Sequence, residues 1–232
     1  MVDGKNVLPM ATSQDHKARD NGDLGPNTGG MGAYSPAPVV TDTVYQKIMN
    51  EVILPTVEGM AADGNDYVGF LYAGLMVSPD GGISVVEFNC RFGDPEAQPV
   101  MLRLQSNLTA HCLAALNQSL DSETAEWDSR SAVGIVLAAG GYPLSYNKGD
   151  KIEGLELAAS AGRKIFHAGT AEKDGDVVTN GGRVLCATAL GESVSEAQAA
   201  AYELVKTVHW ENVYYRTDIA HRAVRREQDA AL

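Results

Sequence analysis

One short stretch of the chain concentrates residue types that could bind a metal ion and a phosphoryl group. It is the segment VEFNCRFGDPE at residues 86–96. Glu87 and Asn89 stand two apart at the end of an expected strand, so their side chains point to one face. A carboxylate and an amide oxygen suit Mg²⁺, which takes its other ligands from water and nucleotide phosphates. Arg91 continues the alternation and would place a guanidinium beside the metal, where it could clamp a phosphoryl group or a carboxylate.

The same segment ends with two more carboxylates, those of Asp94 and Glu96. They lie in an irregular stretch expected over residues 89–99, directly after the strand. The alternative interpretation is a strand end that carries solvated charges. Short motifs match by chance often enough that this motif alone leaves both interpretations open.

A glycine-rich segment, GPNTGGMGAY at residues 25–34, could hold an anionic ligand. Glycines let the backbone approach a ligand closely and turn its N–H groups towards an anion. The segment is neither a Walker A loop, because no Gly-Lys-Ser/Thr follows, nor a GxGxxG motif. A flexible linker is the alternative, less favoured because proline, asparagine, threonine and methionine are not typical of linkers. The candidate ligand-binding residues are Asn27, Thr28, Gly29, Gly30, Met31 and Gly32.

The other polar candidates carry weaker signals. Lys17 could meet a phosphate, and Asp15 could accept from a ribose hydroxyl or an amine. An isolated Asp-His-Lys is more often a solvated turn, which the residues alone favour. Arg183 follows two glycines that predict a tight turn, although an arginine beside glycines could also reach the active site. Four histidines lack metal-ligand spacing and are expected to be structural: His111, His167, His209 and His221.

Strands, helices and turns must position these residues. Asp3-Gly4 predicts a hairpin turn, and residues 7–11 would form its returning strand. Only Met1 and Val2 precede the turn as its outgoing strand. The sequence therefore suggests that the chain begins inside a domain. Residues 13–38 are polar, glycine-rich and too long for an ordinary connector, so a functional or disordered loop is expected. Further along, periodicity predicts helices over 42–60 and 108–120, a buried strand over 67–77, a turn over 79–82 and a strand over 83–88.

The polar, acidic residues 121–130 predict a domain boundary, because the pattern then changes to short strands with glycine turns. These strands are expected over 132–139, 164–168 and 183–190. The run from Ser193 to Glu196 is a capping box that opens a helix. Its inward-facing residues would be Ala197, Ala201, Leu204, Val205 and Val208. The prediction is an α+β chain with a β-rich C-terminal domain and a packed helix.

Composition limits the classes of function. With 232 residues and 44% hydrophobic content, the chain can bury a sizeable core. A net charge of −12 repels nucleic acid phosphates, but it allows a nucleotide substrate because bound Mg²⁺ reverses the local field. The longest apolar run, residues 68–77, is far short of a membrane span. Three cysteines without a CxxC motif fit reduced thiols and predict a cytoplasmic protein. From the net charge and the short apolar run, no nucleic acid or membrane partner is expected.

Taken together, the motifs resemble the phosphoribosylamine–glycine ligase family, also called glycinamide ribonucleotide synthetases. The resemblance covers nearly the whole chain, in the family's order and approximate spacing. It implies an ATP-grasp enzyme of purine biosynthesis that joins glycine to 5-phosphoribosylamine while ATP becomes ADP and phosphate. The stretches that carry it are LPMATSQDHK (8–17), GPNTGGMGAYSP (25–36), GFLYAGLM (69–76), VEFNCRFGDPE (86–96), AAGGYP (138–143), FHAGT (166–170) and TNGGRVLC (179–186).

The resemblance also implies roles for the candidate residues. Glu87 and Asn89 would hold the Mg²⁺ or Mn²⁺ that bridges the ATP phosphates. Arg91 would stabilise charge on the transferring phosphoryl group or on the glycine carboxylate. Residues 27–32 would bind the phosphoribosyl group. The carboxylates of Asp94 and Glu96 would orient the amine or the ribose.

The main departure from the family is length. Residues 1–125 resemble the C-terminal part of an ATP-grasp domain whose N-terminal part is absent, and residues 126–232 resemble the family's C-terminal domain. The expected N-terminal domains, with the adenine-contacting segment and the lysines of the ATP clamp, have no counterpart. The chain is therefore interpreted either as the ligase in fragment form, needing its N-terminal half as a partner, or as a non-catalytic remnant. Either way, an under-buried apolar patch is expected near Met10, Leu71 and Leu75.

Overall fold

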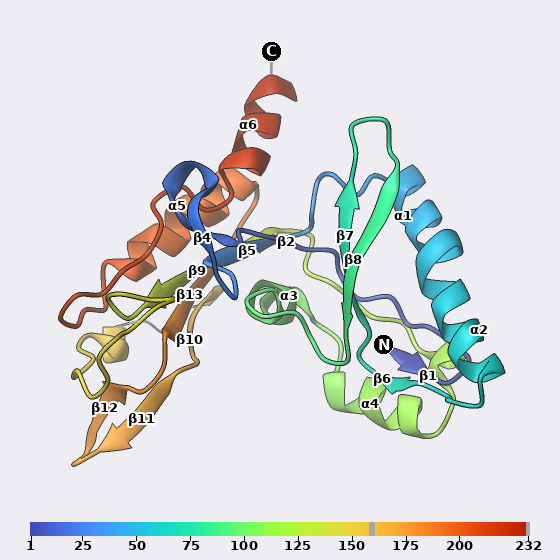
Figure 1. Ribbon diagram of the computed structural model, residues 1–232, viewed down its shortest axis with the longest axis horizontal. Coiled ribbons are helices and arrows are strands. Elements are labelled where there is room, and N and C mark those ends of the chain that lie inside the picture. Colours follow the sequence, from blue (N-terminus) through green and yellow to red (C-terminus); the bar gives the residue numbers. More distant parts are fainter. Residues whose placement is uncertain (158–160, 231–232) are drawn as a thin grey trace. The chain divides into compact units, whose positions relative to one another are not determined.

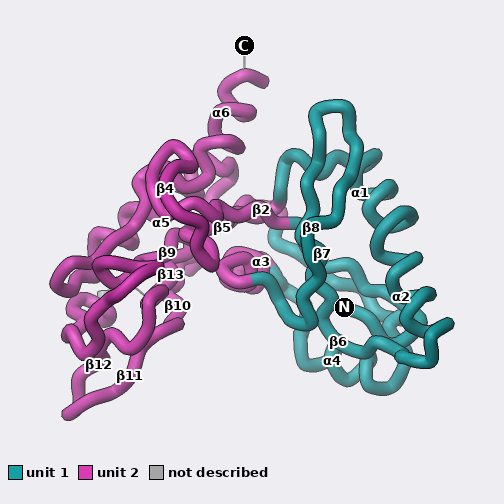
Figure 2. The backbone as a smooth tube through the Cα atoms, in the orientation of Figure 1, with its two compact units in different colours: residues 1–12, 37–93, 104–128 teal, residues 13–36, 94–103, 129–232 magenta. Residues whose placement is uncertain are grey.

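The computed structural model describes residues 1–157 and 161–230 and contains two compact units (Figure 2). Residues 158–160 and 231–232, which fall in the expected C-terminal domain, lie outside the described residues. Unit 1 contains residues 1–12, 37–93 and 104–128, and unit 2 contains residues 13–36, 94–103 and 129–232. Helices and strands occur in both units, which confirms the α+β class. The division into sequence domains at residue 125 stays a prediction.

The helix expected over residues 42–60 of unit 1 is confirmed, with one irregular turn. Thr41 begins it, since its side chain accepts from the backbone N–H of Val44. α1 (Asp42–Ile48) continues through a π-helical turn (Met49–Ile53) into α2 (Leu54–Ala62). Pro55 explains the wider turn, because proline has no N–H to donate and its ring would clash with the carbonyl four residues earlier.

The N-terminal turn pairs the first residues with the segment after them. Leu8 N–H donates to the Met1 carbonyl at 2.9 Å, and the Met1 amine donates to the Leu8 carbonyl at 2.8 Å. The turn expected at Asp3-Gly4 is therefore confirmed, and Gly4 has a φ of 96° there. β1 (Val2–Asp3) also pairs antiparallel with β6 (Val68–Gly69).

A long antiparallel ribbon dominates the rest of unit 1 (Figure 1). It consists of β7 (Tyr72–Val77) and β8 (Ile83–Asn89). The expectation of one buried strand over residues 67–77 is wrong in two ways. The segment splits into β6 and β7, and β7 is only partly buried because it pairs with β8 alone among the described residues.

Apolar side chains remain exposed on this ribbon. The most exposed are Met76 and Val86, each at 65%. The residues expected to be under-buried, Met10, Leu71 and Leu75, are half-buried. The exposed patch therefore lies further along the ribbon than predicted.

The small core of unit 1 lies against α4 (Leu108–Leu116), where Asn107 caps the helix by accepting from two backbone amides. The helix is shorter than the predicted 108–120, because Leu120 belongs to a separate 3₁₀ turn (Leu120–Ser122). The buried core residues are Met1, Leu8, Ala114, Ala115 and Leu120.

Within the described residues, unit 2 is built around a five-stranded antiparallel sheet in the order β10-β13-β9-β5-β2. Its strands are β10 (Arg163–His167), β13 (Arg183–Gly191), β9 (Ser131–Ala138), β5 (Gly32–Ser35) and β2 (Gln14–Asp15). The three strands expected after residue 130 are confirmed. The outer elements are the hairpins β3 (Ala18–Asp20) with β4 (Leu24–Asn27) and β11 (Thr170–Lys173) with β12 (Asp176–Thr179), and the short 3₁₀ turns Asn21–Asp23 and Leu155–Leu157.

Residues 13–38, expected to form a functional or disordered loop, are not a loop throughout and are not disordered, whereas their functional role stays a prediction. The segment is ordered, and its β5 lies inside the sheet, pairing with β9 on one side and β2 on the other. All four residues of β5 are buried. A strand buried on both faces shows no polar–apolar alternation, so its pattern resembles that of a loop.

Within the described ranges of unit 2, three α-helices accompany the sheet. α3 (Ala97–Arg103) lies partly within the stretch predicted as irregular, and Arg103 donates to the Ser35 hydroxyl at 2.9 Å. α5 (Val194–Val205) packs on the sheet, and α6 (His221–Ala230) packs against α5. All five apolar residues expected to face inward from this helix are buried, although Val208 lies beyond the end of α5. Among the described residues, no helix is long and apolar enough to cross a membrane.

We expect the cap of α5 to contribute measurably to stability. The Ser193 hydroxyl accepts from the Glu196 N–H at 3.1 Å. Ser193→Ala removes this acceptor and should lower the free energy of unfolding by about 1 kcal/mol. Urea unfolding followed by fluorescence in a Trp127→Phe background, which leaves the buried Trp210 of unit 2 as reporter, measures it. Ser193→Asp keeps a capping oxygen and should lose little; equal losses for both variants would contradict the cap.

Candidate functional site

The predicted metal ligands lie at the end of β8 in unit 1. Glu87 faces Gly74 and Asn89 faces Tyr72 in the regular part of the ladder, so the two side chains share a face of the ribbon. A Cβ on Gly74 would lie 3.2 Å from Glu87 Cγ. The absence of a side chain at residue 74 therefore leaves room for the glutamate stem beside the ribbon.

This arrangement has the donor set that a magnesium ion needs from a protein. Glu87 is exposed, and within the described part of the chain its side chain makes no hydrogen bond or ion pair. Asn89 Oδ1 accepts a long 3.4 Å hydrogen bond from Arg91 Nη2. An exposed carboxylate and a half-buried amide oxygen on one face fit an ion that keeps several waters and shares substrate phosphates.

Arg91 lies next to these ligands, just past the end of β8. Its Nη1 donates to the Phe92 carbonyl at 2.7 Å, which fixes the guanidinium close to Asn89. The side chain is exposed, so its remaining donors can reach an anion. Glu87, Asn89 and Arg91 are thus brought together as the spacing predicts.

The glycine-rich loop lies in unit 2, and most of its backbone N–H groups already donate hydrogen bonds to other groups of the protein. Thr28 N–H donates to the Lys17 carbonyl at 2.8 Å, and Met31 N–H donates to the His16 carbonyl at 2.8 Å. The Gly29 N–H donates to Tyr142 Oη at 3.0 Å, and the Gly30 N–H donates to the Thr28 hydroxyl at 2.9 Å. The expectation that this loop turns its amides towards an anion is therefore not met at these positions.

Close packing explains the glycines of this loop. A Cβ on Gly30, where φ is 113°, would lie 2.3 Å from Pro95 Cδ. A Cβ on Gly29 would lie 2.9 Å from the guanidinium carbon of Arg183. The glycines therefore let three segments approach one another, and the loop is a rigid part of unit 2 rather than a flexible linker.

The other loop candidates occupy different environments. Asn27 is exposed at the end of β4, so its amide can reach a ligand. Met31 is fully buried in the core, and Gly32 begins the buried strand β5. The side chain of Met31 is therefore a packing element of the core.

The two carboxylates after the metal motif also differ. The Asp94 side chain is 50% exposed and its Oδ2 pairs with Arg183 Nη2 at 2.7 Å. Glu96 is buried, and its carbonyl accepts from Val100 N–H in the turn that begins α3. Asp94 is thus open to a ligand from solvent, whereas Glu96 lies beneath the surface of unit 2.

Asp15 and Lys17 interact with each other. Lys17 Nζ lies 2.9 Å from Asp15 Oδ2, and the lysine side chain is 48% exposed. Asp15 lies on β2 at the end of the sheet order, beside Ala33 of β5. A ligand that used either group would have to compete with this ion pair.

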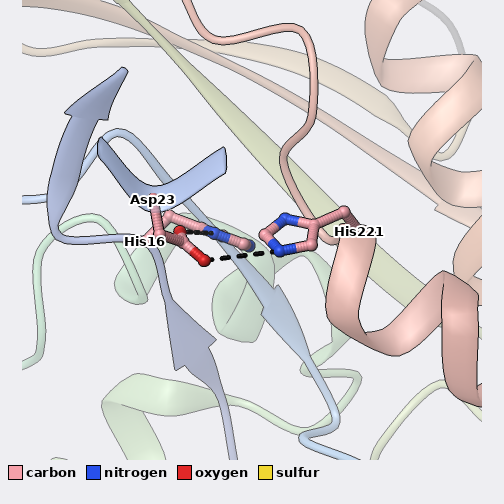
Figure 3. A group of neighbouring side chains, drawn as sticks. All are labelled: His16, Asp23 and His221. Atoms are coloured by element: carbon pink, nitrogen blue, oxygen red, sulfur yellow. Dashed lines mark hydrogen bonds and ion pairs between the residues drawn. The ribbon is translucent and has the colours of Figure 1, made fainter. Parts of the chain in front are cut away.

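A second cluster of possible metal ligands consists of His16, Asp23 and His221 (Figure 3). Their ligand atoms lie close enough together to hold a metal ion, but these atoms already bind other groups of the protein. His16 Nε2 accepts from the Ala220 N–H at 2.9 Å, so its Nδ1 carries the proton and donates to Asp23 at 3.3 Å. A neutral imidazole has one lone-pair nitrogen, and in His16 it is already used. Two arginines also contact the Asp23 carboxylate, Arg216 at 3.1 Å and Arg222 at 2.8 Å. The cluster is therefore a structural ion-pair network.

This network predicts that unit 2 loses stability in mild acid. Burial, followed by the nearby Arg216, lowers the pKa of His16 from 6.5 to about 4. The neutral form is thus favoured in the folded state, and its stabilisation is complete above about pH 6.5 and lost as pH falls towards 4. Between about pH 7 and pH 5, the free energy of unfolding should drop by about 2 kcal/mol from this group alone. Urea unfolding in the Trp127→Phe background measures the drop.

The matched variant for this prediction is His16→Gln. It cannot be protonated, so its unfolding free energy should depend much less on pH over the same range. An equal pH dependence in both proteins would show that another group causes the acid sensitivity.

Sequence reasoning did not select two residues that the structure brings to the glycine-rich loop. Tyr142 accepts from Gly29, and Arg183 contacts both the loop and Asp94. The signals available were the Gly-Gly pairs beside each of them. These were interpreted mainly as turns, although Arg183 was also considered for the active site.

Comparison with known proteins assigns the chain to a family. The ATP-grasp (A) domain of phosphoribosylglycinamide synthetase matches residues 1–97, and the C domain of the same enzyme matches residues 132–222. The chain belongs to the phosphoribosylglycinamide synthetase family. It carries the end of an ATP-grasp core followed by the β-rich C-terminal domain, as the resemblance implied.

Individual relatives agree with this assignment. The chain is 64% identical over 228 residues to phosphoribosylamine–glycine ligase of Vibrio vulnificus, covering 98% of this chain and 53% of that protein. It is 61% identical to the Escherichia coli enzyme of the same name, covering 99% of this chain and 54% of that protein. A crystal structure of this ligase from Thermotoga maritima superposes with a TM-score of 0.82 at 40% identity, over 94% of this chain and 54% of that one. The chain thus spans about half the length of the curated relatives it matches.

Proposed function

We propose that the chain supplies the metal-binding and substrate-binding parts of a phosphoribosylamine–glycine ligase. The reaction is ATP-dependent ligation of glycine to 5-phosphoribosylamine, which gives glycinamide ribonucleotide, ADP and phosphate. The observation that carries the proposal is the pair of oxygen ligands on one face of the ribbon, the exposed Glu87 and the half-buried Asn89, with the Arg91 guanidinium beside Asn89. The family assignment supplies the substrates.

The proposed chemistry has two steps that balance. A glycine carboxylate oxygen attacks the γ-phosphorus of ATP, and the bond to the ADP oxygen breaks, which leaves glycyl phosphate. The phosphoribosylamine nitrogen then attacks the acyl carbon, phosphate leaves and the nitrogen loses a proton. Arg91 would stabilise the negative charge on the transferring phosphoryl group, an electrostatic rather than a covalent role.

Glu87 and Asn89 would hold Mg²⁺ or Mn²⁺, which supplies charge neutralisation for the ATP phosphates when bound. Asp94, Asn27 and the exposed edge of the glycine-rich loop would contact the phosphoribosylamine side of the reaction. Lys17 and Asp15 are secondary candidates because they already pair with each other. Three free cysteines support a cytoplasmic location.

Calorimetric titration with Mg·ATP tests the proposal. The titration is done on this chain alone and on the chain mixed with the part of the Vibrio vulnificus relative that it does not match, here called the complementing part. We expect weak or no binding by the chain alone, because half a nucleotide site cannot hold ATP in a reactive geometry. We expect binding by the mixture that the complementing part alone does not reproduce. A mixture that binds no better than the complementing part would favour a non-catalytic remnant.

A further inference from the structure

The Arg183 side chain donates hydrogen bonds to both the glycine-rich loop and Asp94, an arrangement that the sequence does not predict. Its Nη1 donates to the carbonyls of Gly29 at 2.7 Å and Asp94 at 3.0 Å, with a longer 3.4 Å approach to Gly30. Its Nη2 donates to Asp94 Oδ2 at 2.7 Å. All these partners belong to unit 2, yet they lie 89 to 154 residues away in the chain. One side chain therefore joins two of the candidate substrate-binding segments.

The surroundings fix the guanidinium in place. Arg183 begins β13, a central strand of the sheet, and its side chain is only 20% exposed. The guanidinium lies directly against the Gly29 Cα, where any Cβ would come within 2.9 Å of it. Tyr142 Oη holds the other side of the same residue by accepting from its N–H. The Gly29 peptide groups are thus held at both the nitrogen and the oxygen.

The pairing leaves one face of Asp94 available. Oδ2 is bound to Arg183, whereas Oδ1 receives no hydrogen bond within the described part of the chain. The side chain is half exposed. The arginine therefore orients a half-exposed carboxylate whose second oxygen can accept from an amine or a hydroxyl.

We infer that Arg183 is a positioning residue for the phosphoribosylamine-binding surface of unit 2. It acts through Asp94 and the Gly29–Gly30 backbone rather than by touching the reacting atoms. An arginine is needed because its planar fork can donate to two carbonyls and a carboxylate at once, whereas a lysine is a single point charge. This inference rests on the proposed function, because the identity of the substrate comes from it.

The test is steady-state kinetics of the chain with its complementing part, comparing Arg183→Met and Arg183→Lys. Arg183→Met should raise the KM for phosphoribosylamine by about 10-fold or more, since small misplacements of binding groups are costly. The KM for Mg·ATP should stay within about 2-fold, because the metal ligands lie elsewhere in the chain. Arg183→Lys keeps the charge and should show a smaller increase in the same KM.

A double-mutant cycle with Asp94→Asn separates positioning from general destabilisation. Because Arg183 acts in part through Asp94, Arg183→Met and Asp94→Asn together should raise the KM by less than the product of their separate effects. Arg163→Met removes an exposed arginine of β10 in the same unit and should leave both KM values unchanged. Thermal melting identifies any variant that fails to fold. If Arg183→Met does not fold, Arg183→Lys is compared with the wild type instead.

The two possible failures give different results. If the wild-type mixture makes no glycinamide ribonucleotide, the proposed function fails and the inference fails with it. If the wild-type mixture is active but the arginine variants keep the wild-type KM for phosphoribosylamine, the inference alone is overturned. A parallel rise in both KM values, or full additivity with Asp94→Asn, would assign Arg183 a merely structural role.

Discussion

Replacing Glu87 by glutamine should lower turnover of the chain with its complementing part by about 100-fold or more. The substitution keeps the size of the side chain and one oxygen but removes the negative charge that a divalent cation requires. Asn89→Ala should have a smaller effect, because the amide is a neutral ligand. Release of ADP at saturating glycine and phosphoribosylamine measures both variants. Raising the Mg²⁺ concentration should partly restore the Glu87→Gln enzyme.

Glu58→Gln is the matched control for this prediction. Glu58 is an exposed acid on α2 of the same unit, so its substitution changes the net charge equally. We expect turnover to be unaffected. If Glu87→Gln retained wild-type turnover and the same Mg²⁺ dependence, Glu87 would not be a metal ligand.

Gly30→Ala should destabilise unit 2 by about 3 kcal/mol or more. The added methyl group would come within 2.3 Å of Pro95 Cδ, and φ at this residue is 113°, where side chains are strained. Both costs fall on a loop that is fixed on each side by Arg183 and Tyr142. Urea unfolding monitored by Trp210 fluorescence in the Trp127→Phe background reports the loss.

Gly175→Ala separates the two costs. Gly175 has a φ of 85° in the turn between β11 and β12, with open space around its Cα. Its substitution should cost only about 1 kcal/mol, from the backbone conformation. Equal losses for the two variants would mean that the contact between Gly30 and Pro95 has little importance for stability.

Features that depend on neighbouring residues could be predicted from the sequence. Thr41 and Ser193 begin helices because their hydroxyls accept from amides only three residues ahead. The shared face of Glu87 and Asn89 follows from strand geometry over three residues. In each case, the deciding interaction lies within one turn or one strand.

Features that depend on distant partners could not be predicted. The local sequence of β5 predicts a loop, because its partner strand β9 lies about 100 residues further along the chain. The only partial burial of β7, against the buried strand expected over 67–77, is not predicted because burial depends on what covers a strand, not on the strand's own composition. The contact between Arg183 and Asp94 also has no local signal, since two glycines beside an arginine equally suggest a turn.

Product formation by the chain and its complementing part tests the central claim most directly. The mixture is incubated with Mg·ATP, glycine and 5-phosphoribosylamine, and glycinamide ribonucleotide and ADP are quantified together. We predict one ADP for each glycinamide ribonucleotide, with no product when glycine or the amine is omitted, and loss of product with Glu87→Gln in this chain. ADP release that does not depend on the amine, or product formed equally well by the complementing part alone, would contradict the proposal that this chain carries the metal and substrate sites.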